Sequence, residues 1–149
     1  MIYIAHRGLT NGPDSALQNN PEQIELALGQ GYECEIDVWY KAEGGWYLGH
    51  DGPEYKIDYE FLEQSGLWIH AKNLAALHFL TCTNLNCFWH ENDAYTLTSH
   101  GYIWTFPGQQ LAKNSVMVMP EHVDTTLDLA RQATCYAVCS DYVEILRNE

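Results

Sequence analysis

Short apolar runs that end in polar side chains recur along this chain, and each has the length of a strand rather than of a helix. Residues 2–5 lead to His6, for example, and residues 46–48 lead to Gly49 and His50. Such runs, bounded by glycine, proline or polar residues, are typical of buried strands. The strands predicted in this way cover residues 2–8, 33–40, 46–49, 67–71, 87–93, 101–106, 115–121 and 136–139.

Helical spacing separates several of these strands. Asn20 and Asn73 each stand before an apolar pattern of helical period and are typical N-cap residues, and a proline follows Asn20 at the first helical position. The same spacing predicts a short helix over 58–63 and another helix over 123–132. Gly44-Gly45 instead predicts a hairpin. This alternation of strands and helices predicts an α/β fold with a parallel sheet.

Two carboxylates stand on one face of the strand predicted over 33–40. Glu35 and Asp37 are two residues apart, which is the period of a strand, so both side chains point the same way. Such a pair repels unless a hard cation or a shared proton lies between the two groups, or unless it belongs to a structural ion-pair patch. With His6, Arg7 and His50 at the ends of other apolar runs, these residue types suit phosphoryl transfer.

These motifs, taken in chain order, resemble the signature of the glycerophosphodiester phosphodiesterase family, within the phospholipase C-like phosphodiesterase superfamily. One such short motif would carry little weight, but several in the family's order are specific. The segments that carry the resemblance are His6-Arg7-Gly8, Asn20, Glu35-Ile36-Asp37, His50-Asp51, Trp104-Thr105 and Ser140-Asp141.

The resemblance implies a barrel of the triosephosphate isomerase (TIM) type that holds a divalent metal ion. By position, His6 and His50 would be the general acid and base, and Arg7 would bind the phosphate. Glu35 and Asp37 would be metal ligands.

The strand predicted over 67–71 departs from the family pattern at one position. Lys72 matches the lysine of the family pattern and would be a further catalytic residue. His70, however, stands where the family has a third metal-binding carboxylate. His70 is either a third metal ligand or an outer residue that orients the ligands. The resemblance favours Mg²⁺ or Ca²⁺, whereas an imidazole ligand would suit Mn²⁺ or Zn²⁺.

The chain is short for a complete barrel. A TIM barrel typically has about 250 residues, and this chain has 149. Between Asp93 and Tyr102 there is no room for a crossover helix. We therefore expect one domain over 1–149 that forms a small or incomplete TIM-type barrel, with shortened helices and about seven strands. Uncovered apolar surface would make a homodimer plausible.

The net charge, the apolar runs and the cysteines limit the partners and the location that can be expected for this protein. The formal net charge is −13, which argues against nucleic acid as a partner. The resemblance implies a small-molecule phosphodiester as the partner, and because the same net charge opposes an anionic substrate, it favours a bound cation beside Arg7, Lys72 and a histidine. No apolar run reaches the length of a membrane helix or a signal-peptide core, so a cytoplasmic location is expected. The five cysteines are better interpreted as small buried side chains than as a zinc site, given their loose spacing.

The function predicted from the sequence is metal-dependent hydrolysis of a glycerophosphodiester-like substrate with histidine acid/base catalysis. Two alternatives stay open. One is an inactive barrel that binds a phosphate ligand or a protein, and the other is a lyase-type relative that forms a cyclic phosphate. The residues expected to carry the chemistry are His6, Arg7, His50 and Lys72, with Glu35, Asp37 and His70 at the metal.

Overall fold

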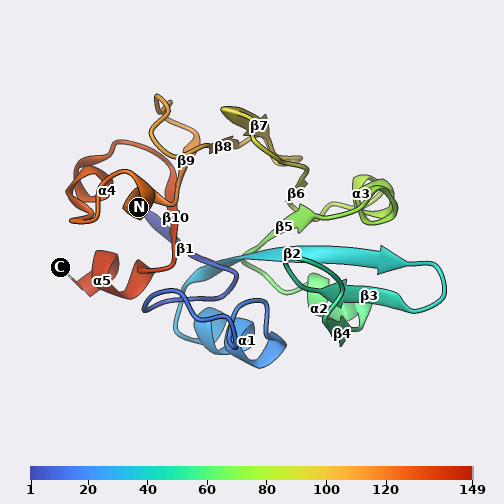
Figure 1. The fold of residues 1–149 in the computed structure, drawn as a ribbon. Helices are drawn as coiled ribbons and strands as arrows, with labels where there is room; N and C mark the ends of the chain where they lie inside the picture. Colours follow the sequence, from blue (N-terminus) through green and yellow to red (C-terminus); the bar gives the residue numbers. More distant parts are fainter. Residues whose placement is uncertain (149) are drawn as a thin grey trace.

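The computed structural model describes residues 1–148, which form a mixed α/β fold built on one curled ten-stranded sheet with short helices around its outside (Figure 1). The strands are β1 Ile2–His6, β2 Glu33–Lys41, β3 Gly45–Leu48, β4 Tyr55–Ile57, β5 Leu67–Ala71, β6 Cys87–Phe88, β7 Tyr95–Leu97, β8 Ile103–Thr105, β9 Ser115–Val118 and β10 Ala137–Ser140. The helices are α1 Pro21–Gly29, α2 Tyr59–Leu62, α3 Leu74–Thr81, the 3₁₀ helix η1 Pro120–His122, α4 Asp128–Gln132 and α5 Val143–Asn148. Among residues 1–148, no helix has both the length and the apolar character needed to cross a membrane.

Seven of the strands run parallel, in the order β8-β9-β10-β1-β2-β5-β6. The first strand of the chain therefore pairs with the last, β10, and the sheet curls round from there. Strands β3 and β4 extend β2 as an antiparallel hairpin, and β7 is antiparallel to β8. In the described chain no ladder joins β6 to β8, although the Ser99 N–H donates to the Cys87 carbonyl at 2.9 Å beside this opening. The predicted α/β class is confirmed, whereas a closed TIM-type barrel is not.

The first half of the chain follows the predicted elements closely. Helix α1 begins after Asn20, whose side chain accepts a hydrogen bond from the Glu22 N–H. Helix α3 begins after Asn73, whose side chain accepts from the Ala76 N–H. The predicted hairpin at Gly44-Gly45 is also present, as β2 and β3. Both caps and the turn are local signals, which is why they could be found from the sequence.

The second half differs from the prediction at several boundaries. The strand predicted over 87–93 ends at Phe88, and the helix predicted over 123–132 begins only at Asp128. The strand predicted over 115–121 ends at Val118, because Met119 has the left-handed φ of 45° and a proline follows it. Strands β4 and β7 and helix α5 were not predicted, since two are three-residue strands and the third is a six-residue helix.

The loop before α4 is held by one carboxylate. Asp124 accepts hydrogen bonds from the Leu129 N–H at 2.9 Å, from the Thr126 hydroxyl at 2.7 Å and from the Thr126 N–H at 3.1 Å. The bond from Leu129, followed by that from the Thr126 hydroxyl, lowers the pKa of Asp124 because each stabilises the charged form. These bonds replace the first turn of the helix that the apolar spacing predicts.

Apolar layers lie on both sides of the parallel strands. The inner layer fills the curl of the sheet, and the outer layer lies between β2, β5 and helices α1 to α3. A smaller outer cluster contains Leu127, Ala130, Val138 and Leu146. Because the inner layer is rich in aromatic rings, it closes the interior and leaves polar groups only towards the two ends of the strands. The inner layer contains Ile4, Trp68, Phe88, Trp104, Val116, Val118, Met119, Ala137 and Cys139.

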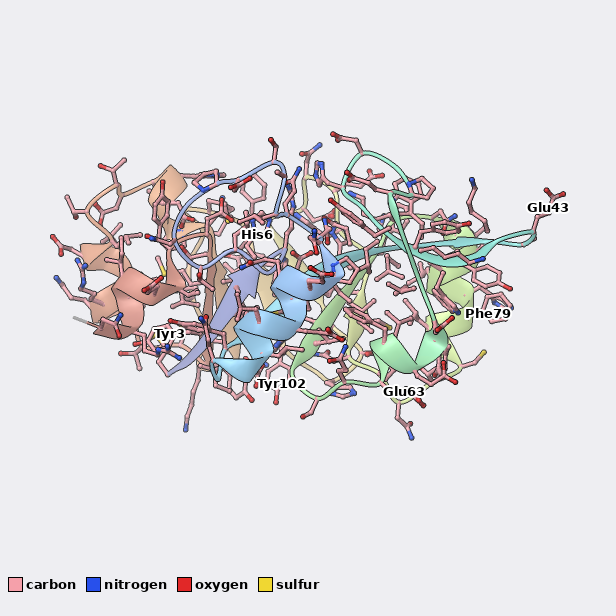
Figure 2. The ribbon with its side chains drawn as sticks, turned by 90° about the horizontal axis from the view of Figure 1, so that it is seen from below. Tyr3, His6, Glu43, Glu63, Phe79 and Tyr102 are labelled. Atoms are coloured by element: carbon pink, nitrogen blue, oxygen red, sulfur yellow. The ribbon has the colours of Figure 1, made fainter. Side chains whose placement is uncertain are left out.

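The two ends of the curled sheet differ in chemistry. Figure 2 shows His6, at the carboxyl end of β1, toward the upper side of the molecule, and Tyr102 and Glu63 toward the lower side. At the lower end Tyr102 donates a hydrogen bond to the Tyr136 hydroxyl at 3.0 Å, and the two rings stack. The charged groups of interest therefore gather at the carboxyl ends of the parallel strands, where enzymes with parallel sheets place their sites.

One outer face of the sheet has no helix over it. No helix connects β6 with β8 or β8 with β9 in the described chain, and Leu97 on β7 is 69% exposed. A groove of about 520 Å³ beside it contains no charged side chain. This is the uncovered apolar surface expected of a shortened fold, and the homodimer stays a prediction.

Candidate active site

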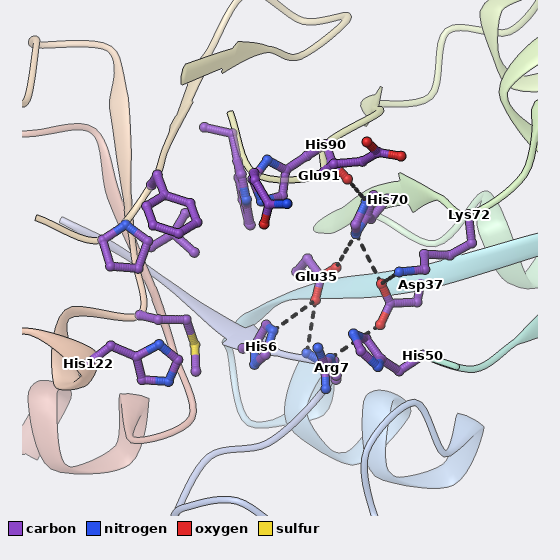
Figure 3. Close-up of a pocket in the computed structure, with 16 residues that line it drawn as sticks. His6, Arg7, Glu35, Asp37, His50, His70, Lys72, His90, Glu91 and His122 are labelled. Atoms are coloured by element: carbon purple, nitrogen blue, oxygen red, sulfur yellow. Dashed lines mark hydrogen bonds and ion pairs between the residues drawn. The ribbon is translucent and has the colours of Figure 1, made fainter. Parts of the chain in front are cut away.

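A cavity of about 580 Å³ opens at the carboxyl ends of the parallel strands (Figure 3). All seven side chains predicted to carry chemistry line it, although they come from four separate segments of the sequence. Five of its lining residues are histidines. The full lining is His6, Arg7, Glu35, Asp37, His50, His70, Lys72, His90, Glu91, Asn92, Trp104, Phe106, Pro107, Val118, Met119 and His122.

Strand register brings the central groups together. His6 on β1 lies beside Glu35 on β2, and Asp37 on β2 lies beside His70 on β5. Glu35 and Asp37 are both buried on the cavity side of β2, while the intervening Ile36 packs in the outer apolar layer. The period-two prediction that both carboxylates share a face is confirmed.

The Asp37 carboxylate has partners on both oxygens. Its Oδ2 accepts a hydrogen bond from Asn19 Nδ2 at 2.9 Å and lies 3.2 Å from Arg7 Nε. Its Oδ1 lies 3.0 Å from His70 Nδ1 and 3.9 Å from Lys72 Nζ. Burial alone would raise the pKa of Asp37, but His70, Arg7 and Asn19 outweigh burial and lower it.

The Glu35 carboxylate is buried as well but has fewer partners. Its Oε2 accepts from the Arg7 backbone N–H at 3.2 Å and lies 4.0 Å from His6 Nε2. Its Oε1 lies 3.7 Å from His70 Nδ1. Burial, followed by the charge of Asp37, raises the pKa of Glu35. A cation beside this pair would offset both effects.

Glu35, Asp37 and His70 could together hold a metal ion. Each offers one ligand atom, and these three atoms all lie within 4.8 Å of one another. Two carboxylates and an imidazole are ordinary ligands for a divalent cation. The arrangement is therefore compatible with the metal site that the sequence predicted.

His6 is oriented by a carboxylate from the other end of the chain. Its Nδ1 lies 2.8 Å from Oδ1 of Asp141, just after β10, which leaves Nε2 on the side of Glu35. Burial lowers the pKa of His6, but the bond to Asp141 and the charge of Glu35 outweigh it, and the net shift is upward. Glu121 fixes this corner, because its Oε1 accepts from the Asp141 N–H and the Ser140 hydroxyl, each at 2.9 Å.

The role of Asp141 did not emerge from the sequence analysis. Ser140-Asp141 appeared there only as part of a resemblance, and 135 positions separate Asp141 from His6. The signal available was a polar pair at the end of an apolar run. Only the pairing of β10 with β1 shows which histidine it meets.

His50 also lines the cavity, and Figure 3 shows it near Arg7. Its side chain is 37% exposed, and its Nδ1 lies 2.8 Å from Oδ1 of the neighbouring Asp51. The turn before it is anchored by Trp39, whose Nε1 donates to the Gly49 carbonyl at 2.7 Å. A Cβ atom at Gly49 would collide with the Gly52 carbonyl oxygen, so glycine is required there.

Asn19 is a buried part of the site that the sequence analysis missed. It is fully buried with a left-handed φ of 55°, and its Oδ1 accepts from the Asp37 N–H at 2.9 Å. Asn20, which was matched to the family motif, instead caps α1. The available signal was an asparagine pair before a proline, because asparagine tolerates the left-handed region better than most residues.

The remaining wall of the cavity lies over β6, β8 and β9. His90, Asn92 and Trp104 line it. Glu91 lines the cavity as well, whereas Asp93 does not, because the strand predicted over 87–93 ends at Phe88 and the residues after it do not keep the period of a strand. This wall is completed by Phe106, Pro107, Val118, Met119 and the exposed His122.

Comparison with known proteins found no relative: no protein-family model, no curated protein and no solved structure matches this chain. The resemblance to the glycerophosphodiester phosphodiesterase family therefore stays a hypothesis that rests on the motifs and on the geometry of the cavity.

Proposed function

We propose that this protein is a phosphodiester hydrolase that uses a divalent cation and two histidines, and that it acts on a glycerophosphodiester-like substrate. One observation carries the proposal. The side chains that the sequence predicted for this chemistry, drawn from four segments of the chain, line one cavity around two buried carboxylates. Chance placement of seven such residues would scatter them over the surface.

Charge at the site favours an anionic substrate despite the acidic chain. Arg7 and Lys72 lie 3.2 Å and 3.9 Å from Asp37 and offset the charges of Glu35 and Asp37. Glu35, Asp37 and His70 would hold the cation, which supplies two further positive charges that stabilise the oxygens of the phosphate. The loaded site would thus attract a phosphodiester that the net charge of −13 repels elsewhere.

His6 and His50 are each oriented so that one ring nitrogen can exchange a proton. In both His6 and His50 the Nδ1 atom faces an aspartate at 2.8 Å, so Nδ1–H donates and Nε2 is left to exchange a proton. One would deprotonate the attacking water and the other would protonate the leaving alkoxide. Arg7 and Lys72 would hold the phosphate oxygens while this happens.

We also propose that the fold is a small, incomplete TIM-type barrel. It is supported by seven parallel strands in chain order around the curl, with first and last paired, and by a cavity at their carboxyl ends. The crossover helix is missing between β6 and β8, which accounts for part of the short length.

The test is phosphodiesterase activity on a panel of glycerophosphodiesters with EDTA, Mg²⁺, Ca²⁺, Mn²⁺ or Zn²⁺. We expect cation-dependent product that is lost in His6→Ala and kept in His78→Ala, since His78 is exposed on α3 away from the cavity. Phosphorus NMR of the product distinguishes an open monoester from the cyclic phosphate of a lyase. Binding of the diesters without product under any cation would refute catalysis and favour the inactive binding module.

A further inference from the structure

We infer that His70 makes the cation site selective for an ion that binds imidazole, such as Zn²⁺, over Mg²⁺ and Ca²⁺. The inference rests on the cation of the proposed function and names its class. It concerns binding, however, and can be tested without turnover. It also reverses the preference for Mg²⁺ or Ca²⁺ that the family resemblance implies.

The contacts of His70 show which of its ring nitrogens carries a hydrogen. His70 Nε2 lies 3.0 Å from the backbone carbonyl oxygen of His90. A carbonyl oxygen can only accept, so Nε2 must be the donor. In the neutral ring the lone pair is then on Nδ1, the atom that lies 3.0 Å from Asp37 and 3.7 Å from Glu35.

The His70 ring is held in place by two neighbours. Its plane is parallel to the Phe88 ring within 8°, with 5.2 Å between the ring centroids. Together with the bond to the His90 carbonyl, this stacking fixes both the tilt and the direction of the imidazole. A histidine whose second nitrogen donates to a carbonyl is the usual arrangement of a metal-binding histidine.

One oxygen of each carboxylate remains free of backbone and amide donors. Asn19 holds Oδ2 of Asp37, and the Arg7 N–H holds Oε2 of Glu35. Nδ1 of His70 lies 3.0 Å from Oδ1 of Asp37 and 3.7 Å from Oε1 of Glu35, and one ligand atom from each of these three residues lies within 4.8 Å of the others. Lone pairs this close together in a buried place require a metal ion or a proton between them, beyond the Lys72 ammonium that lies 3.9 Å from Oδ1 of Asp37.

The donor set then decides the class of metal. Mg²⁺ and Ca²⁺ take oxygen ligands, and Mg²⁺ demands octahedral geometry with retained water. Zn²⁺ binds histidine nitrogen and carboxylate oxygen, and catalytic zinc sites have three protein ligands and one open position. Glu35, Asp37 and His70 supply that number and that chemistry.

The test is calorimetric titration of the metal-free full chain with Zn²⁺ and with Mg²⁺. Three variants accompany the wild type: His70→Gln removes the imidazole, His70→Asp restores an all-oxygen site, and His78→Ala removes an exposed histidine on α3. We expect the wild type and His78→Ala to bind one Zn²⁺ more than about tenfold tighter than Mg²⁺. His70→Gln should lose at least about tenfold in Zn²⁺ affinity, the lower end of what loss of even an outer partner costs.

Two further readouts keep the test decisive. Thermal unfolding shows whether each variant is folded, and His70→Asp should gain Mg²⁺ affinity relative to Zn²⁺, which a misfolded protein cannot do. The absorption spectrum of bound Co²⁺ reports nitrogen ligation and should change in His70→Gln but not in His78→Ala.

Equal affinity of the wild type for Mg²⁺ and Zn²⁺, or a Zn²⁺ site that survives in His70→Gln, would overturn the inference. These outcomes are separable from failure of the proposed function. Turnover that is best with Mg²⁺ would refute the selectivity alone, and tight Zn²⁺ binding through His70 without turnover on any diester would refute the activity alone.

Discussion

Replacing Asn19 by alanine should destabilise the protein far more than the same change at its neighbour Asn20. Both are asparagines at the entrance to α1, but their side chains do different things. Asn19 makes two hydrogen bonds with Asp37, accepting from its N–H at 2.9 Å and donating to its Oδ2 at 2.9 Å. Asn20 accepts one bond, from the Glu22 N–H, at the end of a helix.

The size of the expected loss in unfolding free energy follows from the hydrogen-bonding groups that each substitution leaves unpaired. Asn19→Ala strands a buried N–H and removes a donor from a buried carboxylate, each at about 1–3 kcal/mol. Asn19 also has a φ of 55°, where alanine costs roughly a further 1 kcal/mol. The total is about 3–7 kcal/mol, against roughly 1 kcal/mol for loss of the cap in Asn20→Ala.

The assay is urea denaturation of both variants, with the free energy of unfolding extrapolated to water and the denaturant dependence compared with that of the wild type. At this chain length, Asn19→Ala should also lower the melting temperature by more than about 6 °C. Equal losses in the two variants would refute the argument, because they would mean that the paired bonds to Asp37 add nothing beyond the helix cap.

Three further predictions concern other parts of the molecule. Asp141→Asn should lower kcat by about 10²–10⁴-fold with the circular dichroism spectrum unchanged, because it releases the tautomer and orientation of His6; a loss below about threefold would contradict this role. The lowered pKa of Asp124 stabilises the fold above the unfolded-state pKa of about 3.9, and this stabilisation is lost as pH falls through the folded-state pKa. The difference in unfolding free energy between wild type and Asp124→Asn should therefore be largest near pH 7 and shrink as the pH falls below the unfolded-state pKa, and a difference that does not depend on pH would exclude the charge as its cause. Gly49→Ala should cost about 1–3 kcal/mol by overpacking, whereas Gly52→Ala, whose added Cβ meets nothing within 4 Å, should be neutral; equal melting temperatures would contradict the collision.

The sequence predicted best what depends on near neighbours. The caps at Asn20 and Asn73 and the common face of Glu35 and Asp37 all follow from residues within a few positions of one another. These features depend on local hydrogen bonding and on the period of a strand, which are fixed by the backbone itself. The parts of the site that lie on β1 and β2 could therefore be placed before the structure was known.

What the sequence did not predict depends on distant contacts or on weak local patterns. Asp141 reaches His6 only because β10 pairs with β1, and no local pattern indicates that pairing. Asn19 was passed over because its capping neighbour carries the stronger local signal. The strand β7, Tyr95–Leu97, is too short to show a period, and it forms because β8 offers it an antiparallel partner.

The distribution of helices around the sheet explains how so short a chain can keep a charged site. Glu35 and Asp37 are buried charges, and their partners must be held within a few tenths of an ångström if burial is to be offset. Their strand β2, with its neighbours β1 and β5, has α1, α2 and α3 packed behind it, and a buried apolar layer fixes its register. Strand β8, which no crossover helix joins to β6 or to β9 in the described chain, borders the side of the cavity lined by Trp104, Phe106, Pro107, Val118 and Met119, where position matters less. Helices therefore pack behind the strands whose charged side chains must be placed precisely, and they are missing beside the strand that contributes to the apolar wall of the cavity.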